Sequence, residues 1–457
     1  MRWVKLFSIL SVGLILFVGC SGFVNSDLES INPVVETPVE SDSLLIYCEP
    51  SMVNMLHFTA AIFKKEFPDV NLELRQFGNP NDPESYVAFF ETLTTDLSAG
   101  KGPDVIVSFH TFPDIHKVAR SGVFENLDAY MEKDSTFLED DFFQGVMDGG
   151  IINGERLFVP LDFWANIFVS SEETMNAFDV HFTGTPTFAQ WHDTMQSFFE
   201  DFYYTGQSFT NLVGTMNEFT LLKYSGVHWM DYETGEIRVR TEEFRQLMEM
   251  AKVLYNLSED TYSDDWEHWF SIGGGKTVKE IMSQDYLFAC AITPREFVEL
   301  YAGLMDQQTP VHYSFPHTDE TALGASAMHF AAVNSTSKNK DMAYEFIKIM
   351  LSEEVQTNDY FAGFPVRKSS LALSLNKLNA EYANRSVPDG SVIFQTISEN
   401  VISSFIDEMD AARYTSTDSE LAAEIIIEGM TAYFKSDRSY DACLDEVENK
   451  LSLYVFE

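Results

Sequence analysis

The sequence between residues 44 and 107 reads LLIYCEPSMVNMLHFTAAIFKKEFPDVNLELRQFGNPNDPESYVAFFETLTTDLSAGKGPDVIV. Three short apolar runs, at 44–48, 70–74 and 104–107, are separated by two longer stretches whose apolar residues recur at helical spacing. Strands that alternate with helices in this way form right-handed β-α-β units and a mainly parallel sheet. The stretch therefore predicts an α/β fold.

The rest of the chain is consistent with that fold class. Apolar stripes at helical spacing recur at residues 244–255, 343–351 and 444–454. The length of 457 residues suits two domains, because a single core rarely grows beyond about 250–300 residues. A hydrophobic content of 45% excludes global disorder.

Charge and cysteine content exclude two classes of protein. The 29 Lys and Arg residues against 71 Asp and Glu residues give a formal net charge of −42. A chain this acidic, without a basic stripe, is not expected to bind nucleic acid. Four Cys residues are too few for a disulfide scaffold or a Cys-rich metal fold.

The N-terminus has the pattern of an export signal. Arg2 and Lys5 precede an apolar run at residues 6–18, which is shorter than the roughly 20 residues of a membrane span and suits residues 1–19 as a signal peptide. The sequence Leu-Phe-Val-Gly-Cys at 16–20 resembles a bacterial lipobox and predicts lipidation of Cys20. An ordinary signal peptide with an incidental Cys is the alternative. Two acyl chains on that Cys would anchor the protein stably.

Residues 20–42 are predicted to be the lipidated Cys and a flexible acidic tether. After Cys20 they contain acids and prolines, no bases and no sustained period. Three Cys residues remain outside the anchor, Cys48, Cys290 and Cys443. They allow one disulfide at most, and three buried thiols are the other possibility.

Nine short motifs follow one another from residue 63 to residue 366. They are FKKEFP (63–68), TDLSAGKGPDVI (95–106), SGVFENLD (121–128), GERLFVPL (154–161), TPTFAQW (185–191), NSTSKNKD (334–341), AYEFIK (343–348), LSEEVQ (351–356) and GFPV (363–366). In this order they resemble the family 1 extracellular solute-binding proteins of ABC importers. The resemblance extends over residues 43–457.

The resemblance implies a two-lobed fold like that of periplasmic binding proteins, in which each lobe is a mainly parallel sheet flanked by helices. Crossover segments join the lobes, which close on ligand about a hinge. The implied lobes are 43–155 plus 325–365 and 156–324 plus 366–457. Gly154, Gly324 and Gly363 lie near the implied crossings, as hinges or as simple turn residues. The implied protein is a monomer without cofactor or metal that serves ABC permease subunits.

Ligands of such folds lie beyond the carboxyl ends of parallel strands. Sugar recognition needs flat aromatic faces and forked polar groups. The segment after Pro160 offers both, in Asp162, Trp164 and Asn166, and in sugar-binding relatives this loop supplies ligand contacts. Packing between the lobes is the alternative. Glu49, at the end of the first strand, is a ligand-binding candidate or a helix cap.

Other candidates follow from position alone. His110 and Thr111 come after a buried strand, and Thr293 and Arg295 lie in a loop where relatives often place an aromatic residue. Arg367 is next to the implied crossing at GFPV. A guanidinium group fits a carboxylate or sulfate as well as a hydroxyl pair, so an acidic solute stays open. Pairing with surface acids is the alternative for both Arg residues.

Three tryptophans, Trp229, Trp266 and Trp269, are either further ligand contacts or core residues. The segment GGGKT at 273–277 is not a phosphate-binding loop, because Phe270 stands where that loop needs Gly. The chain also lacks the serine hydrolase and zinc motifs. A glycoside hydrolase remains an alternative, because it needs only two carboxylates.

The sequence thus predicts a non-enzymatic lipoprotein on the extracytoplasmic face of a bacterial cell membrane. It would bind a carbohydrate, an oligosaccharide in the first instance, and deliver it to an ABC transporter permease. The same fold binding a non-sugar or acidic solute is one alternative. A lipid-anchored hydrolase or a polymer-docking surface lipoprotein is the alternative from another class.

Overall fold

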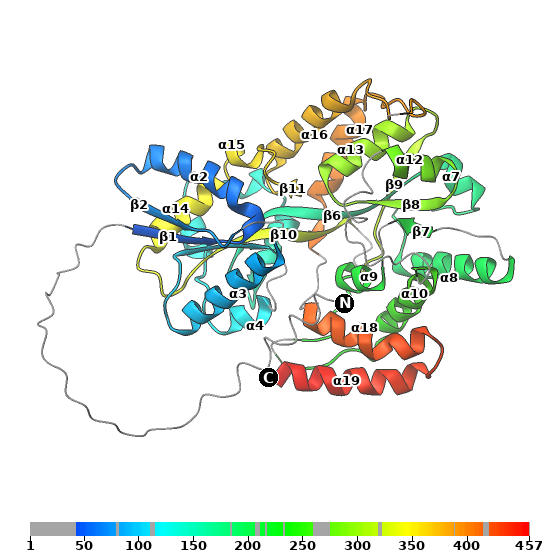
Figure 1. Cartoon of the computed structure of the whole chain (residues 1–457), viewed down its shortest axis with the longest axis horizontal. Helices are drawn as coiled ribbons and strands as arrows, with labels where there is room; N and C mark the ends of the chain where they lie inside the picture. Colours follow the sequence, from blue (N-terminus) through cyan, green and yellow to red (C-terminus); the bar gives the residue numbers. More distant parts are fainter. Residues whose placement is uncertain are drawn as a thin grey trace, which may run out of the picture. The chain divides into compact units, whose positions relative to one another are not determined.

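The computed structural model (Figure 1) describes eleven stretches of the chain. They are residues 43–78, 82–109, 115–182, 185–205, 211–214, 217–231, 234–258, 275–318, 322–387, 389–414 and 420–456. Cys20, His110, Thr111, Trp266 and Trp269 lie outside them. Within these stretches, no helix combines the length and apolar character that a membrane crossing requires.

The central sheet has the strand order β2–β1–β3–β10–β6–β8–β7. β1 (Ser43–Cys48) lies between β2 (Asn71–Arg75) and β3 (Val105–Phe109) and pairs in parallel with both. The connections run through α2 (Val53–Glu66) and α3 (Pro83–Ser98), which lie on opposite faces of the sheet (Figure 1). β1 is continuously apolar because both of its faces are covered. The α/β prediction for this stretch is confirmed.

Two antiparallel strands continue the sheet. β10 (Gly324–Val333) pairs with β3 on one side and with β6 (Val159–Ser171) on the other. Only residues 159–166 of β6 take part in the pairing with β10. The remaining residues of β6, 167–171, pair with strands of the other half of the molecule. β6 is therefore shared between the two halves.

The second half of the sheet is built around the end of β6. β8 (Tyr286–Ala291) and β9 (Pro310–Ser314) both pair with it antiparallel, and β7 (Asn211–Gly214) adds to β8 in parallel. β11 (Phe364–Pro365) also pairs with β6. We call the half around β1, β2 and β3 the first lobe and the half around β7, β8 and β9 the second lobe. The residue bounds predicted for the lobes stay a prediction.

Each lobe has helices on both faces of its strands (Figure 1). On one face of the first lobe, α3 and α4 (Ile115–Arg120) cover a core that includes Tyr47 and Ile106. On the other face, α2 and α14 (Lys340–Met350) cover a larger core.

The larger core extends beyond the first lobe to α12 (Gly275–Met282), α13 (Pro294–Leu304) and α17 (Glu399–Asp410). There the Phe297 and Phe405 rings stack with centroids 3.8 Å apart. A single apolar core thus runs behind the strands that the two lobes share.

The opposite face of the second lobe has a separate core. Its helices are α8 (Phe188–Thr205), α10 (Glu242–Ser258), α18 (Glu420–Phe434) and α19 (Tyr440–Phe456). No disulfide joins the cysteines of the described residues, and Cys48 and Cys443 are buried thiols.

The other elements are short or peripheral. They are η1 (Pro50–Met52), α5 (Asp128–Met131), η2 (Glu139–Asp141), α6 (Gln144–Met147), η3 (Asp148–Gly150), β4 (Ile151–Ile152), β5 (Glu155–Arg156), α7 (Glu172–Ala177), α9 (Glu218–Tyr224), α15 (Glu353–Gln356), α16 (Lys368–Tyr382) and β12 (Arg413–Tyr414).

The three glycines singled out in the sequence have different surroundings. Gly154 has a φ of +80° in the turn between β4 and β5, and no neighbouring atom lies within 4 Å of where a Cβ would stand, so it is a turn residue. Gly324 begins β10. At Gly363 a Cβ would lie 2.7 Å from the Phe163 carbonyl oxygen and 2.9 Å from Oδ2 of Asp162. Only glycine lets the chain approach β6 this closely.

Gly363→Ala is therefore expected to destabilise the protein by about 1–2 kcal/mol, because β11 must move away from β6 to admit the methyl group. Urea denaturation measures the change. Ala362→Ser, at the exposed neighbouring position, is the control and should change stability by less than about 0.5 kcal/mol. Equal stabilities for both variants would contradict the close approach.

Candidate ligand-binding site

A row of polar and aromatic side chains follows one face of the shared strands. On β6, Asp162, Trp164 and Asn166 alternate with the buried residues Phe163 and Ala165, and alternate residues of a strand share a face. The structure thus brings together the three residues predicted after Pro160.

β10 contributes the other side of this row. Ser326 lies opposite Trp164, and His329 lies opposite Asp162 at an irregularity in the pairing. We call these five residues, Asp162, Trp164, Asn166, Ser326 and His329, the polar face.

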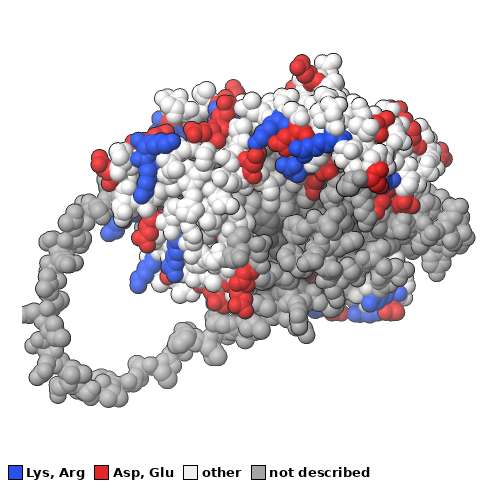
Figure 2. Space-filling model, turned by 45° about the horizontal axis from the view of Figure 1, so that its top comes forward, with Lys and Arg blue, Asp and Glu red and all other residues white. Residues whose placement is uncertain are grey.

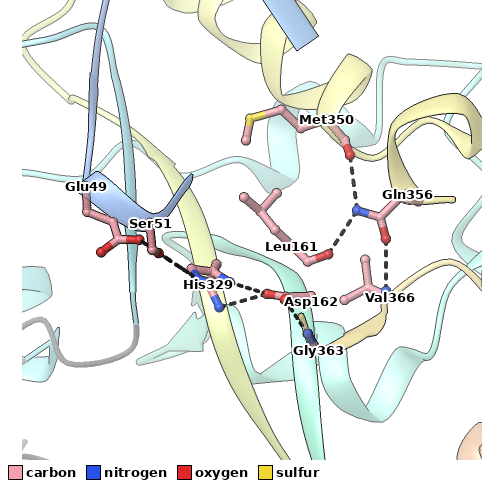
Figure 3. Close-up of polar contacts among 9 residues, drawn as sticks. All are labelled: Glu49, Ser51, Leu161, Asp162, His329, Met350, Gln356, Gly363 and Val366. Atoms are coloured by element: carbon pink, nitrogen blue, oxygen red, sulfur yellow. Dashed lines mark hydrogen bonds and ion pairs between the residues drawn. The ribbon is translucent and has the colours of Figure 1, made fainter. Parts of the chain in front are cut away.

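His329 is held between two carboxylates (Figure 3). Oδ1 of Asp162 accepts hydrogen bonds from the backbone N–H of His329 at 3.0 Å and from its Nδ1 at 2.7 Å. On the other side, Nε2 of His329 lies 3.8 Å from Oε1 of Glu49 and 3.4 Å from Oγ of Ser51. Oδ2 of Asp162 accepts from the backbone N–H of Gly363 at 3.0 Å. The cluster therefore joins β1, β6, β10 and the crossing at β11.

Burial and the neighbouring charges together shift the pKa values of His329 and Glu49. Glu49 and Asp162 are 0% exposed and His329 is 3% exposed. Burial alone would lower the pKa of His329, but the charge and hydrogen bond of Asp162 and the charge of Glu49 outweigh it, so this pKa is raised. Burial, with a smaller contribution from Asp162, raises the pKa of Glu49, although His329 and Ser51 oppose that shift. The imidazolium form of His329 is favoured.

The raised pKa of His329 predicts a stability that falls with increasing pH. Its contribution is fully present below the ordinary pKa of 6.5 and is lost as the pH rises through the raised pKa of the folded state. Glu49, with a pKa raised from 4.5, acts in the same direction. The difference in unfolding free energy between the wild type and His329→Gln should therefore shrink as the pH rises above about 6.5. A constant difference in urea titrations would contradict a change of protonation at His329.

Ser51, His329 and Asp162 have the order of a nucleophile, base and acid, but their chemistry differs from that of a hydrolase. The hydroxyl of Ser51 donates to Oε1 of Glu49, and its contact with Nε2 of His329 is long, at 3.4 Å. The two carboxylates favour the imidazolium, and a general base must be unprotonated to accept a proton. The cluster is suited to fixing the geometry of the crossing strands.

Trp164 lies where the polar face meets the second lobe. Its ring is partly exposed and meets Tyr224 of α9 edge-on, with centroids 6.3 Å apart and planes at 82°. Asn166 and Ser326 are buried beside it. Within the described part of the chain, Nδ2 of Asn166, Oγ of Ser326 and Oε2 of Glu49 are buried without a hydrogen-bond partner. An unmade hydrogen bond at a buried polar atom costs about 1–3 kcal/mol.

Three other predicted residues, Glu49, Thr293 and Trp229, differ in whether a structural role accounts for them. Glu49 precedes η1, but its side chain makes no capping hydrogen bond, so the capping alternative does not account for it. Thr293 caps α13 reciprocally with Glu296. Trp229 is fully buried in the second-lobe core, as the core alternative expects.

The two predicted arginines lie away from the polar face. The side chain of Arg295 is 56% exposed on α13 and lies 4.0 Å from Glu381. Arg367 pairs with Asp141 at 2.5 Å and lies over the ring of Phe142. It lines a surface hollow of about 280 Å³ to which no residue of the polar face contributes.

Other basic side chains on the surface are also paired with acidic side chains. Lys368 lies 2.6 Å from Asp410, and Lys377 lies 2.5 Å from Asp359. Figure 2 shows Lys and Arg side chains next to Asp and Glu side chains over the face it presents. Surface pairing, the alternative for both arginines, is what the described residues show.

Sequence reasoning missed four residues near the site: Ser51, Tyr224, Ser326 and His329. The only local signal for His329 is a lone histidine within the apolar run 324–333. Its position opposite Asp162 depends on the pairing of β10 with β6, which joins segments far apart in the chain.

Comparisons with known proteins agree with this architecture. Residues 51–255 match the family model of the bacterial extracellular solute-binding protein, whereas curated proteins give no match. One similar solved structure is the sugar-binding protein MalE from Xanthomonas citri, with a TM-score of 0.63, 15% identity, and coverage of 90% of this chain and 97% of that one.

Two further solved structures have the same fold. A putative oligosaccharide periplasmic-binding protein from Synechococcus sp. MITs9220 has a TM-score of 0.59 at 15% identity, and covers 90% of this chain and 98% of its own. The cyclic alpha-maltosyl-1,6-maltose binding protein from Arthrobacter globiformis has a TM-score of 0.58 at 13% identity with the same coverage. Over residues 51–255 this chain therefore resembles the bacterial extracellular solute-binding proteins, and it has the two-lobed fold of these solved structures.

Proposed function

We propose that the protein binds a carbohydrate, in the first instance an oligosaccharide, between its two lobes at the polar face. The observation that supports this most strongly is the set of unpartnered polar atoms beside an aromatic ring. Trp164 offers a flat apolar surface for a pyranose ring. Glu49 Oε2, Asn166 Nδ2 and Ser326 Oγ lack partners within the described residues, and they offer acceptors and donors for sugar hydroxyls.

A neutral sugar is favoured over an acidic solute. The argument for an acidic ligand rested on Arg295 and Arg367, and both side chains have acidic neighbours away from the polar face. The side chain of Glu49, which belongs to the site cluster, would repel a ligand carboxylate brought next to it. Similar solved structures include proteins named as binding sugars and oligosaccharides, which supports this choice of ligand class.

The proposal extends to delivery and anchoring. The match to the model of bacterial extracellular solute-binding proteins supports a protein on the extracytoplasmic face of the membrane. The lipobox-like sequence at 16–20 supports an anchor at Cys20, with residues 21–42 as its tether. The lobes would close on the sugar and present it to the permease subunits of an ABC importer. Cys20→Ala should release the protein from the membrane, and retention of the variant in the membrane fraction would contradict the lipid anchor.

Calorimetry on the mature protein with maltotriose, cellotriose, a galacturonate trimer and their monosaccharides tests the ligand class. Saturable binding of a neutral sugar without products is expected. Binding of the galacturonate trimer alone would overturn the neutral-sugar proposal in favour of an acidic solute. Release of shorter sugars would favour a hydrolase. Normal uptake of the bound sugar in a deletion strain would argue for a polymer-docking role.

A further inference from the structure

A contact between α4 and α19 joins the two lobes outside the shared strands. Nζ of Lys117 in α4 lies 2.6 Å from the backbone carbonyl oxygen of Tyr454 in α19, and 3.6 Å from the centroid of the Tyr454 ring. Figure 1 shows the C-terminal end of α19 next to α4. This contact therefore joins the lobes independently of the shared strands β6, β10 and β11.

The two helices belong to different cores. Ala119 of α4 packs with Tyr47 and Ile106 in the first lobe. Tyr454 of α19 packs in the core of the second lobe and is 9% exposed. A change in the angle between the lobes would therefore separate Lys117 from Tyr454, while each helix stayed in its own core.

The contact combines three attractions for one ammonium group. The last carbonyls of a helix have no partner within the helix, and Lys117 donates to one of them. The C-terminal end of a helix also attracts a cation through its dipole. The face of the Tyr454 ring adds a cation–π interaction, which is stronger when the groups are shielded from water.

We propose that Lys117 and the last turn of α19 form a latch that holds the lobes together, so that Lys117 raises ligand affinity without touching the ligand. The effect on affinity rests on the proposed function. A contact that exists only in the closed arrangement shifts the equilibrium toward that arrangement. The apparent affinity of a ligand that binds the closed form rises in proportion to the population of that form.

The chain contains a matched pair within one lobe. Nζ of Lys252 in α10 lies 4.5 Å from the ring centroid of Tyr433 in α18 and donates to Oγ of Ser436 at 3.0 Å. This pair has the same combination of cation–π contact and hydrogen bond. Since both of its helices pack in the second-lobe core, it is unaffected by the angle between the lobes. Lys252→Met therefore controls for the loss of a lysine–tyrosine contact.

The test measures the distance between the lobes without any ligand. Nitroxide labels on Thr94→Cys in α3 and Glu428→Cys in α18, both exposed, report that distance by pulsed electron resonance. Lys117→Met should broaden the distribution and shift it to a different mean distance. Lys252→Met should leave the distribution as in the wild type. Lys117→Arg, which keeps the positive charge, should give a distance distribution close to that of the wild type.

A distribution for Lys117→Met that matches that of Lys252→Met would overturn the latch. If Lys117→Met does not fold, Tyr454→Leu gives a second reading, because it removes the ring and keeps the backbone carbonyl. For the sugar found by calorimetry, Lys117→Met should weaken binding by about 3- to 10-fold. Because the distance measurement uses no ligand, failure of the carbohydrate proposal would leave the latch still testable.

Discussion

Asp162→Ala is expected to lower the free energy of unfolding by about 3–5 kcal/mol, because it leaves a buried charge without its partner. The wild-type carboxylate accepts hydrogen bonds from the backbone and the ring of His329 and from the backbone of Gly363. The variant would leave all three donors without their acceptor at a buried position. Equilibrium denaturation in urea measures the loss.

Two control variants accompany this prediction. One separates the charge of Asp162 from its shape, and the other measures the loss of an exposed ion pair. Asp162→Asn keeps the size and one acceptor, so it should cost less than the alanine variant. Asp359→Ala removes the partner of Lys377 in an exposed pair and should change stability by about 1 kcal/mol or less. An alanine variant at 162 within about 1 kcal/mol of wild type would contradict the role of the cluster.

Trp164→Ala is expected to weaken sugar binding by about 1–3 kcal/mol, because the ring offers the stacking surface for a pyranose. The effect on folding should be smaller than that of a core tryptophan, since the ring is partly exposed. Calorimetry with the sugar that gives the strongest binding measures the change. Tyr360→Ala, an exposed aromatic away from the polar face, should bind as the wild type does. Unchanged affinity in Trp164→Ala would remove this residue from the site.

The fold could be read from the sequence because its signals are local. In residues 44–107, apolar runs of strand length alternate with helical spacing, and breakers such as Pro68 and the segment 100–103 separate them. β1, β2 and β3 form where these runs predict them. The ordered motifs then indicated a resemblance to the extracellular solute-binding proteins, and the family model of these proteins matches residues 51–255.

Only part of the candidate site could be predicted from the sequence. The alternation of a strand was enough to place Asp162, Trp164 and Asn166 on one face. It did not place Arg367. Consecutive residues of an extended chain point to opposite sides, and the sequence does not say which side meets the polar face. Val366 is buried, and Arg367 turns to Asp141.

The capping role of Thr293 can be predicted from the sequence, whereas the pairing of His329 with Asp162 cannot. The pattern Thr293-Pro-Arg-Glu296 is a capping box and could have indicated a structural role for Thr293 from the sequence alone. The pairing of His329 with Asp162 could not have been found in this way. It depends on an irregular register between two segments that meet only in the folded protein.

The sharing of β6 between the lobes has a consequence for dissecting the molecule. No single cut in the polypeptide separates one lobe from the other, because β10 and β11 return to strands laid down much earlier in the chain. A fragment ending before β10 would expose the edges of β3 and β6, and open strand edges promote aggregation. Half-length fragments should therefore be insoluble when expressed alone, and the intact protein should melt in one cooperative transition.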